Sequence, residues 1–268
     1  MAVGEHENGH SHPHEHAPKS DSAGTPWEGR QFDQNSFAGD DGSAPADLLA
    51  ALEKFRARLV NEAVVVDAIR TARLLIPLVA ELGDSSVGHH GLTVDKSADL
   101  AIVTVAGPDG RNVMPVFTSV AAMQSWNPAA RPVPANAVRV ALAAASEDTE
   151  LVVVDATTAT EFVIRRPALW AIAQSLPWLP SYLDEAVLGA FLESAASEAA
   201  VTSILLDTGD VDARLAGPEL VVQLTLIPGL TAAQLEALLS RLQSRWAADV
   251  VIANRVDSLR IQLATATD

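Results

Sequence analysis

The chain has 268 residues, 49% of them hydrophobic, which is enough to bury a core in one or two domains of ordinary size. No apolar run approaches the roughly 18 residues that span a bilayer, and the first residues lack the basic start and apolar block of a signal peptide. Cysteine is absent and the formal net charge is −16, which excludes disulfide scaffolds and thiolate catalysis and argues against nucleic acid and anionic membranes as partners. We therefore expect a cytoplasmic protein with neither membrane nor nucleic-acid partners.

Residues 1–25 predict a disordered tail. They are polar, rich in His, Glu, Ser and Pro, and show no apolar period. Such a segment buries too little apolar surface to offset the entropy lost on ordering. We expect the folded chain to begin near Pro26 and Trp27.

Residues 26–180 predict a first α/β domain. Leu48, Leu52, Phe55 and Leu59 recur at helical spacing, and a second helix is expected over 62–72. Further elements are expected as a strand at 74–82, a hairpin of 100–105 with 113–118 around the turn 107–111, a helix at 119–126, an extended segment at 127–134, a helix from Pro134 to Ala145, a strand at 151–155 and a helix from Pro167 to Gln174. Pro77 favours an edge or a bulge in its strand, because proline donates no backbone hydrogen bond.

Pro177-Trp178-Leu179-Pro180 interrupts both periods and predicts the junction to a second domain at 184–268. Asp184 is expected to cap a helix to 196, and Thr231 with Gln234 forms a capping box that opens another. Strands are expected at 201–206, 220–226, 250–253 and 259–263, in the order α-β-β-α-β-β. The predicted fold class is α/β in the mixed α+β sense: two small sandwich domains with mixed sheets behind a disordered tail.

Several strings in the first domain resemble the SseB family, named for enhanced serine sensitivity, in its actinobacterial form. The most specific piece is Met114-Pro115-Val116-Phe117-Thr118-Ser119 followed by Trp126. The other matching strings are residues 26–30, 37–42, 73–77, 95–99, 108–111, 131–133 and 154–155. The resemblance implies an α/β fold over about 26–180 and brings no agreed reaction, cofactor or catalytic residue.

The tail holds the one local cluster with metal-ligand chemistry. Its histidines are His6, His10, His12, His14 and His16. Neutral imidazole binds Zn²⁺, Ni²⁺ or Cu²⁺, although a tail without supporting contacts would bind weakly. A solvated tail without a physiological metal, and a tail that gains charge on mild acidification, are the alternatives.

Two further groups of polar residues have both a functional and a purely structural interpretation. Asp40 and Asp41 within Gly39–Gly42 could attract a divalent cation, but the calcium-loop pattern fails and a turn before the first helix is favoured. His89 and His90, near serines and aspartates, could be imagined in a catalytic triad, yet no nucleophile elbow supports it.

The arginines and tryptophans also have a functional and an ordinary interpretation. Arg131, Arg165 and Arg166 could bind a small anion, although a solvated or ion-paired edge is the commoner role. The five tryptophans are interpreted as core anchors rather than as a ligand cage.

No nucleophile, phosphate loop or cofactor motif emerges, so the first hypothesis is a non-catalytic binding or adaptor protein with a protein partner. Phe117, Trp126 and Trp178 are predicted to line the partner groove. The second hypothesis is metal handling by the tail histidines. The third is a metabolite-binding regulator or enzyme of amino-acid metabolism, which the family name alone suggests.

Overall fold

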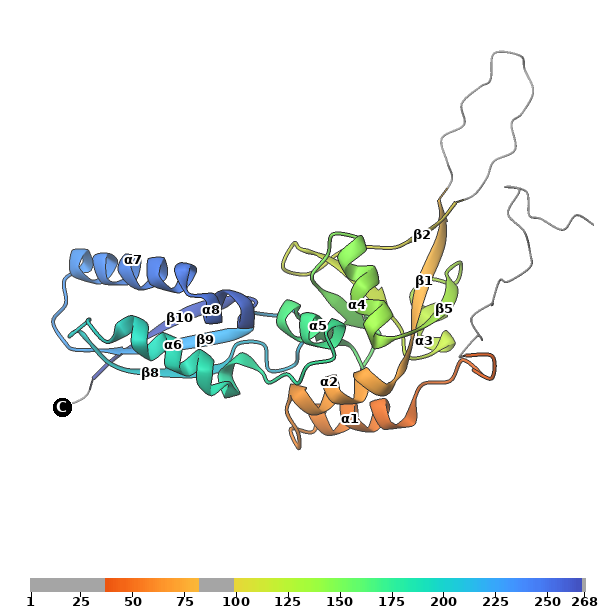
Figure 1. Cartoon of the computed structure of the whole chain (residues 1–268), viewed down its shortest axis with the longest axis horizontal. Helices are drawn as coiled ribbons and strands as arrows, with labels where there is room; N and C mark the ends of the chain where they lie inside the picture. Colours follow the sequence, from red (N-terminus) through yellow and green to blue (C-terminus); the bar gives the residue numbers. More distant parts are fainter. Residues whose placement is uncertain (1–36, 82–98, 267–268) are drawn as a thin grey trace, which may run out of the picture. The chain divides into compact units, whose positions relative to one another are not determined.

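The structure is a computed structural model that describes residues 37–81 and 99–266 (Figure 1). These residues form eight α-helices, one 3-10 helix and ten strands in three sheets. The predicted mixed α+β class is thereby confirmed. All the helices and strands lie in one compact unit, Asp40–Asp268. No helix in the described ranges is long and apolar enough to cross a membrane.

The first half of the described chain contains two sheets, with strand orders β2-β1-β5 and β3-β4-β6-β7. Its elements are α1 (Ala46–Arg56), α2 (Glu62–Thr71), β1 (Arg73–Glu81), β2 (Asp99–Ile102), β3 (Val105–Ala106), β4 (Asn112–Val116), α3 (Val120–Trp126), β5 (Arg131–Asn136), α4 (Ala137–Ser146), β6 (Val152–Val154), β7 (Phe162–Ile164) and α5 (Arg166–Ala173). A bridge between Leu75 and Phe117 joins the two sheets.

Two expectations about the strands are wrong. The run at 100–105 does not pair with 113–118 as a whole: Asp99–Ile102 pairs with β1, and only Val105 and Ala106 form the hairpin with β4. Pro77 lies in the central strand of its sheet, but its register partner is on β5 alone, because the pairing with β2 begins one residue later at Leu78. Proline is accommodated there since no neighbour requires its missing N–H.

The remaining differences concern helix ends. α1 stops at Arg56, and Leu59 is exposed rather than in the core, because Arg58 adopts a left-handed backbone conformation. Pro134 lies in β5, and the next helix is capped by Asn136, whose side chain accepts a hydrogen bond from Arg139 N.

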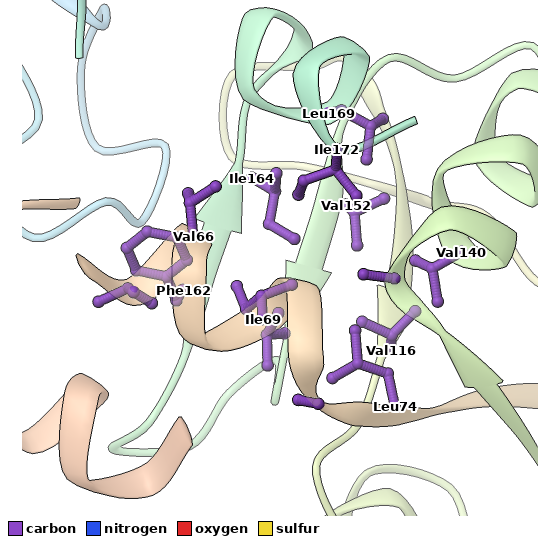
Figure 2. Close-up of a cluster of buried hydrophobic side chains, with 14 of the residues drawn as sticks. Val66, Ile69, Leu74, Val116, Val140, Val152, Phe162, Ile164, Leu169 and Ile172 are labelled. Atoms are coloured by element: carbon purple, nitrogen blue, oxygen red, sulfur yellow. The ribbon is translucent and has the colours of Figure 1, made fainter. Parts of the chain in front are cut away.

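Side chains from both sheets and four helices meet in one core (Figure 2). Ile69 on α2, Val140 on α4 and Ile172 on α5 converge on strand residues such as Val116 and Val152. Burying each such side chain contributes roughly 1.5–3 kcal/mol. Ala213, from the loop between strands of the second half, also belongs to this core.

A buried carboxylate fixes the loops beside this core. Asp155 accepts hydrogen bonds from Thr118 N at 2.7 Å, from Thr118 Oγ1 at 2.8 Å and from Thr160 Oγ1 at 2.8 Å. Both Thr118 and Asp155 are buried, so their polar atoms have no access to water. The two strings at 114–119 and 154–155 are thus joined through the fold.

Replacing Asp155 with Ala should lower the free energy of unfolding by about 3 kcal/mol, because two buried donors of Thr118 and the part-buried hydroxyl of Thr160 lose their acceptor. Asp148→Ala is the matched control: Asp148 is exposed and has a similarly positive φ, so backbone strain alone is shared by both changes. Denaturant unfolding of both variants measures the difference. Equal losses would show that the hydrogen bonds of Asp155 contribute little.

The second half contains one mixed sheet of order β10-β9-β8, with β8 antiparallel and β10 parallel to β9. Its elements are the 3-10 helix η1 (Ser181–Leu183), α6 (Glu185–Ala195), β8 (Val201–Thr208), β9 (Leu220–Leu226), α7 (Ala232–Ala248), α8 (Val250–Arg255) and β10 (Leu259–Thr265). Helices α6, α7 and α8 contribute to a second core with alternate residues of the strands. The predicted capping box at Thr231 and Gln234 is confirmed.

The predicted strand at 250–253 is wrong, so the order is α-β-β-α-α-β. Residues Val250–Arg255 form a helix, because the Asp249 side chain accepts hydrogen bonds from Val251 N and Ile252 N and caps it. Ile252 is buried in the second core, and this packing outweighs the strand preference of the valines. A division into domains at residues 180–184 stays a prediction.

Candidate binding groove

A groove of about 600 Å³ lies at the Pro177–Pro180 segment. Trp170, Leu176 and Leu179 line it and keep 40%, 51% and 54% of their surface exposed. Contiguous exposed apolar side chains of this size mark interaction sites more often than ordinary surface. The groove is therefore the candidate functional site.

Helix α5 and the turn after it position these side chains. Pro167 stands in the first turn of the helix, where its missing N–H costs nothing. The helix ends as Ser175 takes a left-handed conformation and Leu176 N donates to Ala171 O at 2.8 Å. After this turn, Leu176 and Leu179 line the same groove as Trp170.

One face of the Trp170 ring is covered by a guanidinium, whereas its indole N–H makes no hydrogen bond with the described residues. The guanidinium of Arg166 lies over its ring, 4.8 Å from the centroid, which is a cation–π contact one helical turn apart. The indole N–H has no acceptor among the described residues, and neither does the side-chain amide of Asn254 across the groove. The groove therefore combines apolar walls with unpaired hydrogen-bond donors.

The groove is also lined by Asp184, which precedes α6, and by Asn254 and Arg255 of α8. Asp184 caps α6 and pairs with Arg255 at 2.8 Å. Arg166 donates hydrogen bonds to the carbonyls of Ala253 at 2.9 Å and Val256 at 2.6 Å, where α8 ends. These contacts hold α8 beside α5 and fix the width of the groove.

Arg165, the residue before α5, belongs to a buried cluster of charged side chains. Arg165 pairs with Asp210 at 2.7 Å and with Asp257 at 3.0 Å, and Arg111 holds both oxygens of Asp257 at 2.9 Å. Arg165 also donates to Gly217 O at 2.8 Å. Burial acts to raise the pKa of Asp257, but hydrogen bonds and charge from Arg111 and Arg165 outweigh it, so the pKa of Asp257 lies below its usual range.

A second carboxyl beside this cluster behaves in the opposite way. Burial raises the pKa of Glu219, and the hydrogen bond from Asp257 N–H offsets this only in part. Its Oε1 is buried without a hydrogen-bond partner among the described residues, which favours the neutral form.

Glu219→Gln should make the protein progressively more stable than wild type as the pH rises above 4.5. The folded state raises the pKa of Glu219 above its ordinary value, so the wild-type chain loses stability as this group ionises, while glutamine stays neutral. Chemical denaturation of both proteins across the pH range measures the difference. Glu236→Gln, on the exposed side of α7, is the control. A stability difference for Glu219→Gln that does not change with pH would contradict the expectation.

The structure brings together only part of the predicted partner groove. Phe117 and Trp126 contact each other, with ring centroids 5.3 Å apart, in a small cluster where Phe117 is completely buried. Trp178 packs against a different cluster and lines the groove described above. Of the three predicted residues, Trp178 alone belongs to the candidate site.

The other predicted sites are placed as follows. The tail histidines His6, His10, His12, His14 and His16 lie outside the described residues, as do His89 and His90, so their roles stay predictions. Within the described ranges there is no group of three or more acidic or histidine side chains that could hold a metal ion.

The aspartates before the first helix have structural partners. Asp40 Oδ1 accepts from Gly42 N, Asp41 Oδ1 accepts from Ser43 N, and Asp40 pairs with Arg73 at 2.8 Å. This agrees with the turn interpretation.

The anion site imagined at Arg131, Arg165 and Arg166 does not form. Arg131 is exposed, and Arg165 is neutralised by the two buried carboxylates. Arg166 contacts the ring of Trp170 and the carbonyls at the end of α8.

The groove residues Trp170, Leu176 and Leu179 were not predicted from the sequence. The four-residue spacing of Arg166 and Trp170 on a helix was a usable signal.

The described chain is thus an α+β protein with an open apolar groove and a buried ion cluster behind it. Residues 48–171, somewhat less than half of the chain, match the family model of the SseB protein N-terminal domain. Over these residues, which include Arg165 and Trp170 but end before Leu176, the chain is similar to that domain. No curated protein and no solved structure matches the chain.

Proposed function

We propose that this protein is a non-catalytic binding protein of the SseB type, of the cytoplasm, whose groove at Trp170, Leu176 and Leu179 takes an extended, apolar segment of a partner protein. The observation that carries the proposal is the exposure of these three side chains in one groove. The actinobacterial subtype rests on the sequence strings alone and is part of the proposal.

The polar groups of the groove fit a peptide backbone. The indole N–H of Trp170 and the amide of Asn254 are unpaired donors among the described residues, and peptide carbonyls are acceptors that could occupy them. Proline in the ligand would suit such a site, because aromatic-lined grooves bind proline-rich segments and proline brings no N–H that needs an acceptor.

Charge also favours a protein segment over a polyanion. The chain carries a net charge of −16, which repels phosphate backbones. At the groove, Asp184 and Arg255 neutralise each other, while Arg166 lies over Trp170. An apolar segment with few acidic groups therefore meets neither a repulsive field nor a buried unpaired charge.

Leu179→Asp should weaken binding of such a segment at least tenfold, because it replaces an apolar wall by a charge that must be desolvated. Peptides selected from a displayed random library against the full chain provide the ligand, and fluorescence polarisation measures their affinity. Leu142→Asp is the matched control, since Leu142 is 58% exposed on α4 and lies outside the groove.

Two outcomes would contradict the proposal. One is a selected peptide whose affinity both variants leave unchanged, which would place binding elsewhere. The other is a library that yields no apolar or proline-containing binder at all. Loss of affinity with Leu179→Asp alone supports the groove.

A further inference from the structure

Strand β10 forms an edge of its sheet with free backbone groups. Leu220 N donates to Ser258 O at 3.0 Å, and Ala266 N donates to Leu226 O at 2.8 Å. Since successive residues of a strand point their N–H and C=O to opposite sides, the even-numbered residues of β10 face β9. The odd-numbered residues Leu259, Ile261, Leu263 and Thr265 direct theirs away from the sheet, with no backbone partner among the described residues.

The two edges of this sheet differ in how they are protected. β8 has an irregular register between Val201 and Ser203, carries Asp207 and contacts η1. β10 pairs with β9 in unbroken register, contains neither proline nor an acidic residue, and carries a single charge, Arg260. Natural sheets block an exposed edge with bulges, charges or a covering element, and β10 has almost none of these.

We propose that β10 pairs antiparallel with β10 of a second copy of this chain, about a two-fold axis at Gln262. This register matches all seven residues of the strand. It places Ile261 opposite Leu263 and Leu259 opposite Thr265, so the outward N–H and C=O groups of each copy face those of the other. The three-stranded sheet becomes a six-stranded one.

The side chains fit this register as well as the backbone does. Leu259 and Ile261 already pack against the second core, and the partner copy brings Leu263 beside Ile261 on the same face. Leu263 is the exposed leucine of the strand. The pairing covers it and extends the apolar layer of one copy into the other.

Charge favours this edge as the contact between two acidic chains. A chain with a net charge of −16 repels its own copies, and repulsion is least where a strand carries no carboxylate. In the proposed register Arg260 lies opposite Ala264. The two Arg260 residues are then four strand positions apart, roughly 13 Å, which exceeds the Debye length of about 8 Å at physiological salt.

The contact is small, so the dimer should be weak. A seven-residue strand pair buries less than the ~1,200 Å² of a standard interface, and such contacts are transient. We expect a reversible monomer–dimer equilibrium that shifts toward dimer as protein concentration or salt rises.

A single introduced cysteine tests the register, because the chain contains none of its own. Gln262→Cys places two thiols opposite each other at a position where Cβ atoms lie about 4.5–5.5 Å apart, close enough to form a disulfide. Mild oxidation of the full-length variant should give mostly covalent dimer on non-reducing gels. Ser203→Cys, exposed on β8 of the same sheet, is the control and should stay mostly monomeric. Equal yields of dimer from the two variants would overturn the proposal.

Sedimentation velocity over a concentration series tests the equilibrium without a cross-link. Wild type should sediment increasingly as dimer, and Leu263→Lys should shift the midpoint at least tenfold upward, because lysine blocks a strand edge. Leu205→Lys is the matched control, since Leu205 is 59% exposed on the opposite edge strand against 44% for Leu263. A wild type that stays monomeric throughout the series, or a dimer that Leu205→Lys weakens as much as Leu263→Lys, would overturn the proposal.

Discussion

Arg165 lies between two carboxylates, Asp210 and Asp257, in the interior of the molecule. A charge removed from water in this way must be paired, because leaving it alone costs several kcal/mol. Its two partners come from the loop after β8 and the segment before β10, while Arg165 itself directly precedes α5. The cluster therefore ties the second half of the chain to the helix that carries the groove.

Several neighbouring contacts depend on that tie. Leu215 N donates to Asp210 at 2.8 Å, and Ala213 in the same loop enters the first core and accepts a hydrogen bond from Val163 N. With Arg165 fixed, Arg166 reaches the carbonyls at the end of α8 and its guanidinium covers Trp170. The groove is thus a consequence of how the two halves are joined. The apolar lining alone does not define it.

The sequence predicted the local elements well where a periodic pattern or a cap sets them. Helices with clear caps, such as those at Asp184 and Thr231, begin at the predicted residues. The strand predicted at 250–253 is wrong because a short run of valines is typical of a strand, whereas the cap at Asp249 and the burial of Ile252 stabilise a helix.

The site was harder to predict, because Arg165, Asp210 and Asp257 are far apart in the chain and no spacing rule joins them. The segment Pro177–Pro180 stands out in the sequence because proline breaks both periods, and it pointed to Trp178 but not to Trp170.

The most direct test of the role of the Arg165 ion cluster is the unfolding of an Arg165→Met variant, followed by hydrogen exchange of peptides from α2 and β1 and from α6 and β9. Wild type should lose protection in both sets at one denaturant concentration. In Arg165→Met, buried Asp210 loses its ion-pair partner and Asp257 keeps only Arg111, so the second half should open first. Arg241→Met, which removes an ion pair with Glu198 inside the second half, is the control and should preserve the coincidence. Coincident transitions in Arg165→Met, at the wild-type denaturant concentration, would contradict the central role of the cluster.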